Sequence, residues 1–313
     1  MKILVYGMGV IGGYLAHLLC TTENEVTVLA RGAQQTVLER DGLVCRSYFG
    51  RRRTVDHPRV IGALVPDDRY DVIFAVMQFA QMNAILPCLA ANSTPAVVLV
   101  GNNMTACEME SYLHVHSTGP KTVIFGFQAT GGERKDGHYT YVSFGRPALS
   151  AGSTAPADAW QGMLQTAFAG AKYSLSFETD MDGWYKNHLA FILPICFVCY
   201  KYDCNLRRAS RADIEAVMNA ALEGYRLLEH LGYAVAPSDL ACFGKKRGST
   251  RAMLQIMAKT KMGELAATNH ARHAVSELCA LNRAFDALRA QEPSFPMPVW
   301  DILERFMPEH ENE

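Results

Sequence analysis

Three glycines near the start of the chain have the spacing of a phosphate-binding turn. Gly7, Gly9 and Gly12 form a GxGxxG pattern between an apolar run and a helix-forming segment. In that setting the first glycine permits a tight turn, the second lets a diphosphate approach the backbone, and the third lets the helix pack on the strand. Unpaired N–H groups at the start of the helix favour the negative charge. The predicted dinucleotide-binding turn comprises Gly7, Met8, Gly9, Val10, Ile11 and Gly12.

The end of the next apolar run indicates which dinucleotide binds. That run ends at Ala30 and is followed by Arg31. NAD sites usually carry a carboxylate here for the ribose 2′-hydroxyl, whereas an arginine suits a 2′-phosphate. The guanidinium is planar and permanently charged. We therefore expect NADP(H) rather than NAD(H), the alternative being a solvated arginine at the edge of the sheet.

A lysine in the second half of the chain has two possible roles. Lys186 follows Trp184 by two residues and precedes an apolar segment over residues 189–198. From the residues alone, its alkyl chain would cover the core and its ammonium would reach water. An ammonium beside a carbonyl oxygen can also stabilise the charge that develops there during reduction and donate a proton.

The apolar pattern predicts the elements that position these residues. Val/Ile/Leu-rich runs alternate with helix-like segments in the first half, which is typical of a parallel sheet covered by helices on both faces. The expected strands are residues 3–6, 26–30, 72–76, 97–100 and 123–127, and the expected helices are 10–20, 79–91 and 104–114. Residues 43–56 are predicted to form an inserted hairpin and residues 146–158 a surface loop.

The second half has a helical pattern. After a helix at 159–169 and a strand at 173–177, the expected helices are residues 183–204, 209–231, 238–245, 250–262 and 269–290. Apolar side chains recur at helical spacing in the segment 209–231. The prediction is therefore an α/β Rossmann-type domain with a parallel sheet over residues 1–176, followed by an all-α domain over residues 177–313.

The composition indicates which partners and which cellular compartment to expect. The 313 residues are 49% hydrophobic, with 30 basic and 31 acidic residues and a formal charge of -1. No overall field attracts nucleic acid or an anionic membrane, so we expect neither partner. The nine cysteines suit a reducing compartment. Cys196 and Cys199 lie in an apolar segment without a second pair, so no metal is expected. We find no signal peptide or membrane span and expect a cytoplasmic protein.

Together, the glycine turn, Arg31, an asparagine turn after the fourth run and the Trp-x-Lys helix resemble the ketopantoate reductase family. The resemblance implies a two-domain, NADP-dependent reductase of a 2-oxo acid, whose helical domain is similar to the C-terminal domain of 6-phosphogluconate dehydrogenase. It makes Lys186 the general acid. It also places Asn102 between nicotinamide and substrate, although Asn102 could instead cap the helix at 104–114.

The resemblance implies further site residues. The family's carboxylate matches Glu277, within the segment ending at Asn282, while counting without a gap would select Glu264. Met77 and Gln78, at the end of the third run, are expected at the cofactor.

This chain also departs from the family. Met77 stands where the family has lysine, and Ala190 and Pro194 stand where it has asparagines that bind the substrate. These changes predict a less polar site, in which His270 or His273 could supply a polar contact. The implied activity is NADPH-dependent reduction of a 2-oxo acid or related carbonyl compound. The alternatives are a dehydrogenase or reductase of another, less polar substrate, and an NADP-binding sensor or scaffold without turnover. A homodimer is possible.

Overall fold

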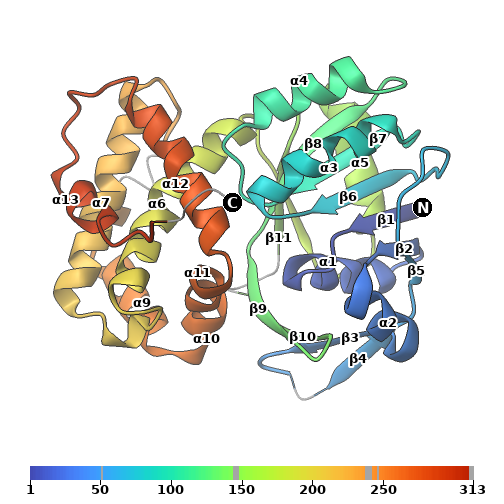
Figure 1. Ribbon diagram of the computed structural model, residues 1–313, viewed down its shortest axis with the longest axis horizontal. Helices are drawn as coiled ribbons and strands as arrows, with labels where there is room; N and C mark the ends of the chain where they lie inside the picture. Colours follow the sequence, from blue (N-terminus) through green and yellow to red (C-terminus); the bar gives the residue numbers. More distant parts are fainter. Residues whose placement is uncertain (51, 144–147, 237–241, 245–246, 310–313) are drawn as a thin grey trace. The chain divides into compact units, whose positions relative to one another are not determined.

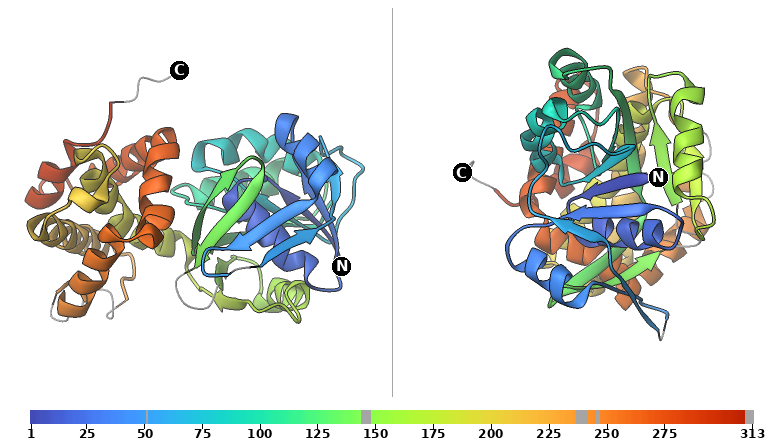
Figure 2. Two further views of the ribbon diagram at one scale, coloured as in Figure 1. Left: turned by 90° about the horizontal axis from the view of Figure 1, so that it is seen from below. Right: turned by 90° about the vertical axis from the view of Figure 1, so that its right-hand side faces the viewer.

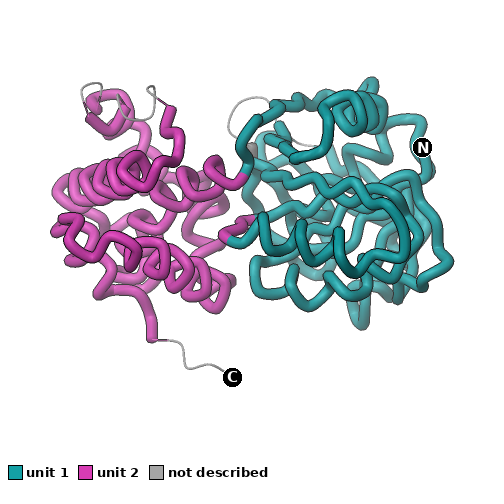
Figure 3. Tube along the Cα trace, turned by 90° about the horizontal axis from the view of Figure 1, so that it is seen from above, with its two compact units in different colours: residues 1–101, 105–181 teal, residues 102–104, 182–313 magenta. Residues whose placement is uncertain are grey.

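The computed structural model describes residues 1–50, 52–143, 148–236, 242–244 and 247–309. The chain forms two compact units (Figure 3). The first contains residues 1–101 and 105–181, and the second contains residues 102–104 and 182–313. The first unit thus ends at Met181, whereas the sequence places the domain boundary at residue 176.

An eight-stranded sheet forms the centre of the first unit (Figure 1), in the order β12-β11-β8-β7-β6-β1-β2-β5. Neighbouring strands are parallel except β8 and β11. The strands are β1 (Lys2–Tyr6), β2 (Glu25–Leu29), β5 (Arg59–Ile61), β6 (Val72–Val76), β7 (Ala96–Val100), β8 (Thr122–Gln128), β11 (Ala148–Gly152) and β12 (Ser174–Phe177). The predicted parallel sheet is confirmed, and the five apolar runs are its strands β1, β2, β6, β7 and β8.

Helices cover this sheet because its strands are apolar on both faces. Ile3 and Val5 of β1 share one buried cluster with Leu15 of α1 and Leu164 of α5. The alternate residue Leu4 is also fully buried, since side chains along a strand point to opposite faces. The helices of this unit are α1 (Val10–Cys20), α2 (Gly32–Asp41), α3 (Phe79–Ala91), α4 (Ala106–His116) and α5 (Ala157–Ala167).

A smaller sheet packs against α1. It consists of β3 (Leu43–Ser47), β4 (Arg53–Asp56), β9 (Thr130–Lys135) and β10 (His138–Ser143), in the order β4-β3-β10-β9. The antiparallel pair β3 and β4 confirms the predicted hairpin. Neither β9 nor β10 was predicted from the sequence. The glycines and charged residues of β9 give a weak strand signal, whereas the Tyr, Thr and Val residues of β10 favour a strand. Tyr141 of β10 packs on Tyr14 of α1, with ring centroids 4.1 Å apart.

The prediction of a surface loop over residues 146–158 is wrong in part. Residues 148–152 form β11, which pairs antiparallel with β8 and parallel with β12. Leu149 and Ala151 are fully buried. Alanine, serine and glycine make up four of its five residues, so the strand forms because the edge of β8 offers backbone partners and an apolar surface rather than through local propensity.

The second unit is built of helices (Figures 1 and 2). They are α6 (Met181–Lys201), η1 (Leu206–Arg208), α7 (Arg211–His230), α9 (Arg247–Lys259), α10 (Lys261–Gly263), the π-helical turn η2 (Glu264–Thr268), α11 (Asn269–His273), α12 (Val275–Arg289) and α13 (Pro298–Glu304). Ser210 and Asp213 form a capping box at the start of α7. Most of the helix expected at 238–245 lies outside the described residues. No helix among the described residues is long and apolar enough to cross a membrane.

The expected single helix over residues 269–290 is wrong. The segment forms two helices, α11 and α12. They are separated at Ala274, whose φ of -124° and ψ of 35° are not helical. No glycine or proline marks this position, so local residue types gave no signal for the break.

Candidate active site

The glycine turn has the geometry that its sequence predicts. Gly7 follows β1 directly and has a φ of +111°, and a Cβ there would lie 2.2 Å from the Val76 carbonyl oxygen. A Cβ at Gly12 would lie 1.8 Å from the Gly7 carbonyl oxygen. Both positions therefore require glycine, because any side chain would collide with backbone.

The space beside Gly9 is open. A Cβ at Gly9 would meet no atom within 4 Å. Gly9 is the N-cap of α1, no side chain caps this helix end, and its first turn holds no acidic residue. Val10 and Ile11 form that first turn. The backbone N–H groups at the start of α1 can therefore receive an anion that approaches over Gly9, which is the arrangement a diphosphate needs.

Arg31 contacts Tyr6, the last residue of β1, which directly precedes the glycine turn. Its Nη2 donates a hydrogen bond to the Tyr6 hydroxyl at 2.9 Å, and the guanidinium carbon is 5.9 Å from the centre of the Tyr6 ring. Arg31 is exposed, and within the described part of the chain no carboxylate forms an ion pair with it. Its positive charge is available to a phosphate.

Met77 and Gln78 follow β6. A Cβ at Gly7 would lie 3.2 Å from the Met77 methyl carbon, so the Met77 side chain packs against the glycine turn. Gln78 is the half-buried N-cap of α3. The structure therefore brings Met77 to the turn, where its thioether offers an apolar surface instead of a charge.

Two residues that the sequence analysis missed also hold the turn. Arg134 Nη1 and the Tyr139 hydroxyl donate to the Met8 carbonyl oxygen at 2.7 Å and 3.0 Å. They come from β9 and β10, more than a hundred residues along the chain. No local motif could reveal them, because the small sheet creates the contact.

Lys186 is a buried ammonium on α6. The residue is 5% exposed, and Nζ donates to Oδ2 of Asp182, one helical turn earlier, at 2.5 Å. Nζ also lies 4.9 Å from the centre of the Tyr233 ring. Its charge is thus balanced by one carboxylate and one aromatic face, which contradicts a purely solvated lysine.

Two aromatic side chains accompany Lys186 on α6. The His188 ring stacks on Trp184, with centroids 5.3 Å apart and planes 14° from parallel. Burial, together with the nearby His270, lowers the pKa of His188 to about 4, so this imidazole is neutral at pH 7. The sequence analysis did not single out His188, although its spacing of four residues from Trp184 is that of helical neighbours.

The two candidate carboxylates have different surroundings. Glu277, on α12, is 4% exposed and its Oε2 lies 3.7 Å from His270 Nε2. Glu264 is paired with Lys261 at 2.7 Å, and the hydrogen bond from Lys261 lowers the pKa of Glu264. Glu264 therefore serves a local ion pair, whereas Glu277 is a buried carboxylate beside a histidine. His273 is exposed.

Asn102 directly follows Gly101 at the end of the β7 segment and belongs to the second unit. It does not cap α4, because that helix begins at Ala106 and Thr105 is its N-cap. The Asn102 Oδ1 atom is buried and has no hydrogen-bond partner in the described structure. A buried acceptor without a partner is costly, so this atom fits a ligand that donates a hydrogen bond.

Ala190 and Pro194, which the resemblance relates to the substrate site, both lie in α6. Ala190 is fully buried, and its Cβ would lie 3.0 Å from a Cβ at Gly224 of α7. Pro194 is also buried within α6. Ala190 thus belongs to the core of the second unit.

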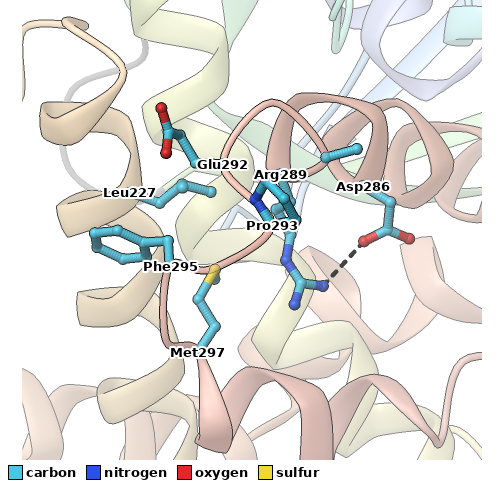
Figure 4. A pocket seen from close by; sticks show the side chains of 8 residues that line it. Leu227, Asp286, Arg289, Glu292, Pro293, Phe295 and Met297 are labelled. Atoms are coloured by element: carbon cyan, nitrogen blue, oxygen red, sulfur yellow. Dashed lines mark hydrogen bonds and ion pairs between the residues drawn. The ribbon is translucent and has the colours of Figure 1, made fainter.

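A separate pocket of about 250 Å³ lies in the second unit, and none of the predicted site residues lines it (Figure 4). It is lined by Leu227, Asp286, Arg289, Ala290, Glu292, Pro293, Phe295 and Met297. Arg289 is already paired with Asp286, Asp301 and Glu304. Its charge is therefore neutralised within the protein. Among the described residues, no group of three or more His, Cys, Asp or Glu side chains could hold a metal ion.

Comparisons with known proteins agree with this architecture. The structure of D-mandelate dehydrogenase with NADH and anilino(oxo)acetate has a TM-score of 0.73 at 13% identity, covering 98% of this chain and 97% of that one. The 2-dehydropantoate 2-reductase from Geobacter metallireducens has a TM-score of 0.73 at 16% identity, with 98% and 99% covered. The enzyme from Methylococcus capsulatus has a TM-score of 0.70 at 16% identity, with 98% and 96% covered.

These structures share the fold of the chain. No curated protein matches the sequence. The family model described as ketopantoate reductase PanE/ApbA matches residues 3–153, which include the glycine turn and Arg31. Residues 3–153 of the chain therefore match the ketopantoate reductase family, as the sequence resemblance predicts.

Proposed function

We propose that this protein is an NADPH-dependent reductase that converts a 2-oxo acid or a related carbonyl compound to the alcohol. The observation that carries the proposal is the burial of Lys186, a proton donor that is 5% exposed and bonded to Asp182. Burial of an ammonium is unfavourable without a partner, and a carbonyl reductase can use such a group as its proton donor.

The first unit supplies groups that suit NADPH. The start of α1 at Gly9 would hold the diphosphate, and Arg31 would hold the 2′-phosphate. Met77 and Gln78 would line the same site. The complex of D-mandelate dehydrogenase with NADH supports a nicotinamide cofactor in this fold. A bound nicotinamide supplies the hydride for carbonyl reduction.

The second unit supplies groups that suit the carbonyl compound. Lys186 Nζ stabilises negative charge on the carbonyl oxygen and donates its proton there. The side chain of Asn102 offers its unpartnered Oδ1 to a donor group. Glu277 accepts from a hydroxyl of the substrate or product. These are the roles that the family resemblance assigns to the three residues.

The substrate proposed first is a 2-oxo acid, with ketopantoate as one candidate. Relatives in fold include both 2-dehydropantoate 2-reductases and a D-mandelate dehydrogenase. Met77 removes a positive charge expected in the family, and the Tyr233 ring lies 4.9 Å from Lys186 Nζ. A bulkier and less polar 2-oxo acid is therefore the second candidate.

Consumption of NADPH by the purified protein tests this function. A panel of aliphatic, branched and aromatic 2-oxo acids should include at least one that accelerates NADPH oxidation. Lys186→Ala should reduce that rate by about 100-fold or more, because general acid catalysis contributes on this scale. Lys172→Ala, which changes an exposed lysine of the first unit, is the matched control. Tight NADPH binding without turnover of any acid would favour the sensor alternative.

A further inference from the structure

The β9–β10 hairpin makes an unexpected contact with the predicted phosphate turn. Arg134 of β9 and Tyr139 of β10 form a directly opposed antiparallel pair. Both donate to the same acceptor, the Met8 carbonyl oxygen, at 2.7 Å and 3.0 Å. Directly opposed residues of a sheet point to the same face, so the hairpin presents one face to the turn.

Close packing around this contact shows which face of the hairpin lies against the turn and α1. A Cβ at Gly132, two residues before Arg134, would lie 2.8 Å from a Val10 methyl carbon. A Cβ at Gly13 would lie 2.5 Å from the Tyr139 ring. Because side chains alternate along a strand, Gly132 and Arg134 face α1 while Lys135 points to the opposite face.

The positive charge of Arg134 lacks an acidic partner in the described part of the chain. The residue is exposed, and across the described ranges of the chain no carboxylate forms an ion pair with it. A guanidinium has five N–H donors, and here it bonds the Met8 carbonyl oxygen and interacts with the Tyr139 hydroxyl, which leaves further donors. A cation with spare donors is therefore held against the loop over which a diphosphate would approach.

We propose that Arg134 is a second cation of the cofactor site, which binds the diphosphate of the dinucleotide while it also holds the Met8 carbonyl. This inference rests on the proposed function, since it assumes that a dinucleotide binds at the glycine turn. It assigns different phosphates to the two arginines. Arg31 recognises the 2′-phosphate, which only NADPH carries, and Arg134 recognises the diphosphate, which NADPH and NADH share.

Equilibrium binding of NADPH and NADH, measured by calorimetry in the absence of substrate, tests this assignment. Arg134→Met should weaken both dinucleotides by about tenfold or more and by a similar factor, because charge-assisted hydrogen bonds to phosphate are lost. Lys135→Met is the matched control. It removes the neighbouring charge of the same hairpin from the opposite face and should change either Kd by less than about twofold.

A second variant separates binding from support of the turn. Arg134→Gln keeps an N–H donor that can reach toward the Met8 carbonyl but has no charge. It should retain a melting temperature close to the wild type and still lose affinity for both dinucleotides. If Arg134→Gln binds like the wild type, or Arg134→Met leaves both Kd values unchanged, the inference is wrong while the proposed function stands. If the wild-type protein binds neither dinucleotide, both are wrong.

Discussion

The reactivity proposed for Lys186 depends on what surrounds its ammonium. Its side chain is 7% exposed, and the Asp182 side chain that accepts its hydrogen bond is 25% exposed. An ammonium removed from water is stable only when charge or aromatic faces replace the lost solvation. Asp182 is therefore a positioning residue, which directs Nζ through its hydrogen bond.

Replacement of Asp182 tests this role. Asp182→Asn removes the partner of a buried charge and should lower the free energy of unfolding by about 1–3 kcal/mol. It should also lower kcat by about tenfold while KM changes little, because Asp182 acts through Lys186 rather than on the substrate. Urea denaturation and steady-state kinetics measure the two effects. Asp182→Glu should recover most of both, and an Asp182→Asn protein with unchanged kcat would remove Asp182 from the account.

The preference for NADPH is a prediction about Arg31. Arg31→Ala removes the guanidinium beside Tyr6 and should weaken NADPH by about tenfold or more while NADH binding changes by less than about twofold. Competition binding with both dinucleotides measures this. Arg40→Ala is the control, because Arg40 lies in α2, the helix that follows Arg31, and is bonded to Asp41. Equal weakening of NADPH and NADH by Arg31→Ala would show that Arg31 does not read the 2′-phosphate.

At the scale of single residues, the sequence predicts local motifs well and contacts between distant parts of the chain poorly. Gly7 and Gly12 follow from a motif whose steric demands are contained within a few residues. Asp182 lies only one helical turn from Lys186, so its contact could have been inferred from spacing. Arg134 could not, because nothing near it in the chain indicates that β9 packs against α1.

At the scale of elements, two sheets with different roles meet at α1. The large sheet positions the glycine turn at the end of β1, and the small sheet supports that turn through Met8. The strands of the large sheet were predictable, because continuous apolar runs identify strands buried on both faces. β9 and β11 were not, since their residues have low strand propensity and pair only because neighbouring strands offer partners.

The acidic cluster at the pocket of Figure 4 gives a prediction about pH. Burial, with a further contribution from Glu304, raises the pKa of Asp286 to about 6, although Arg289 opposes the rise. An unfolded aspartate has a pKa of about 3.9. The folded state therefore binds a proton that the unfolded state releases, and stability associated with Asp286 is present below about pH 4 and lost as the pH rises through 6.

Asp286→Asn, which resembles the protonated side chain, should remove this dependence. Relative to that variant, the wild type should lose stability between about pH 4 and pH 7. Since the Asp286 side chain is 41% exposed, solvent screening limits the difference to about 1 kcal/mol or less. Urea denaturation of both proteins at several pH values measures it. Parallel stability profiles for the two proteins would contradict the raised pKa.

Because the net charge of the whole molecule is close to zero, a charged ligand has to be bound by local groups. With 30 basic and 31 acidic residues, the protein has no overall field to attract an anionic dinucleotide. In the proposed function, affinity for the dinucleotide comes from the start of α1, from Arg31 and from Arg134. The homodimer remains a prediction, in which the helices of the second unit would pair across a two-fold axis.

Transfer of a labelled hydrogen tests the central claim most directly. The purified protein is incubated with a 2-oxo acid and with NADPH deuterated at C4 of the nicotinamide, on each face in turn. The account predicts a 2-hydroxy product that is heavier by about one mass unit with one of the two labelled cofactors, and almost no product with Lys186→Ala. Unlabelled product with both cofactors, or no product from any acid although NADPH binds, would contradict it.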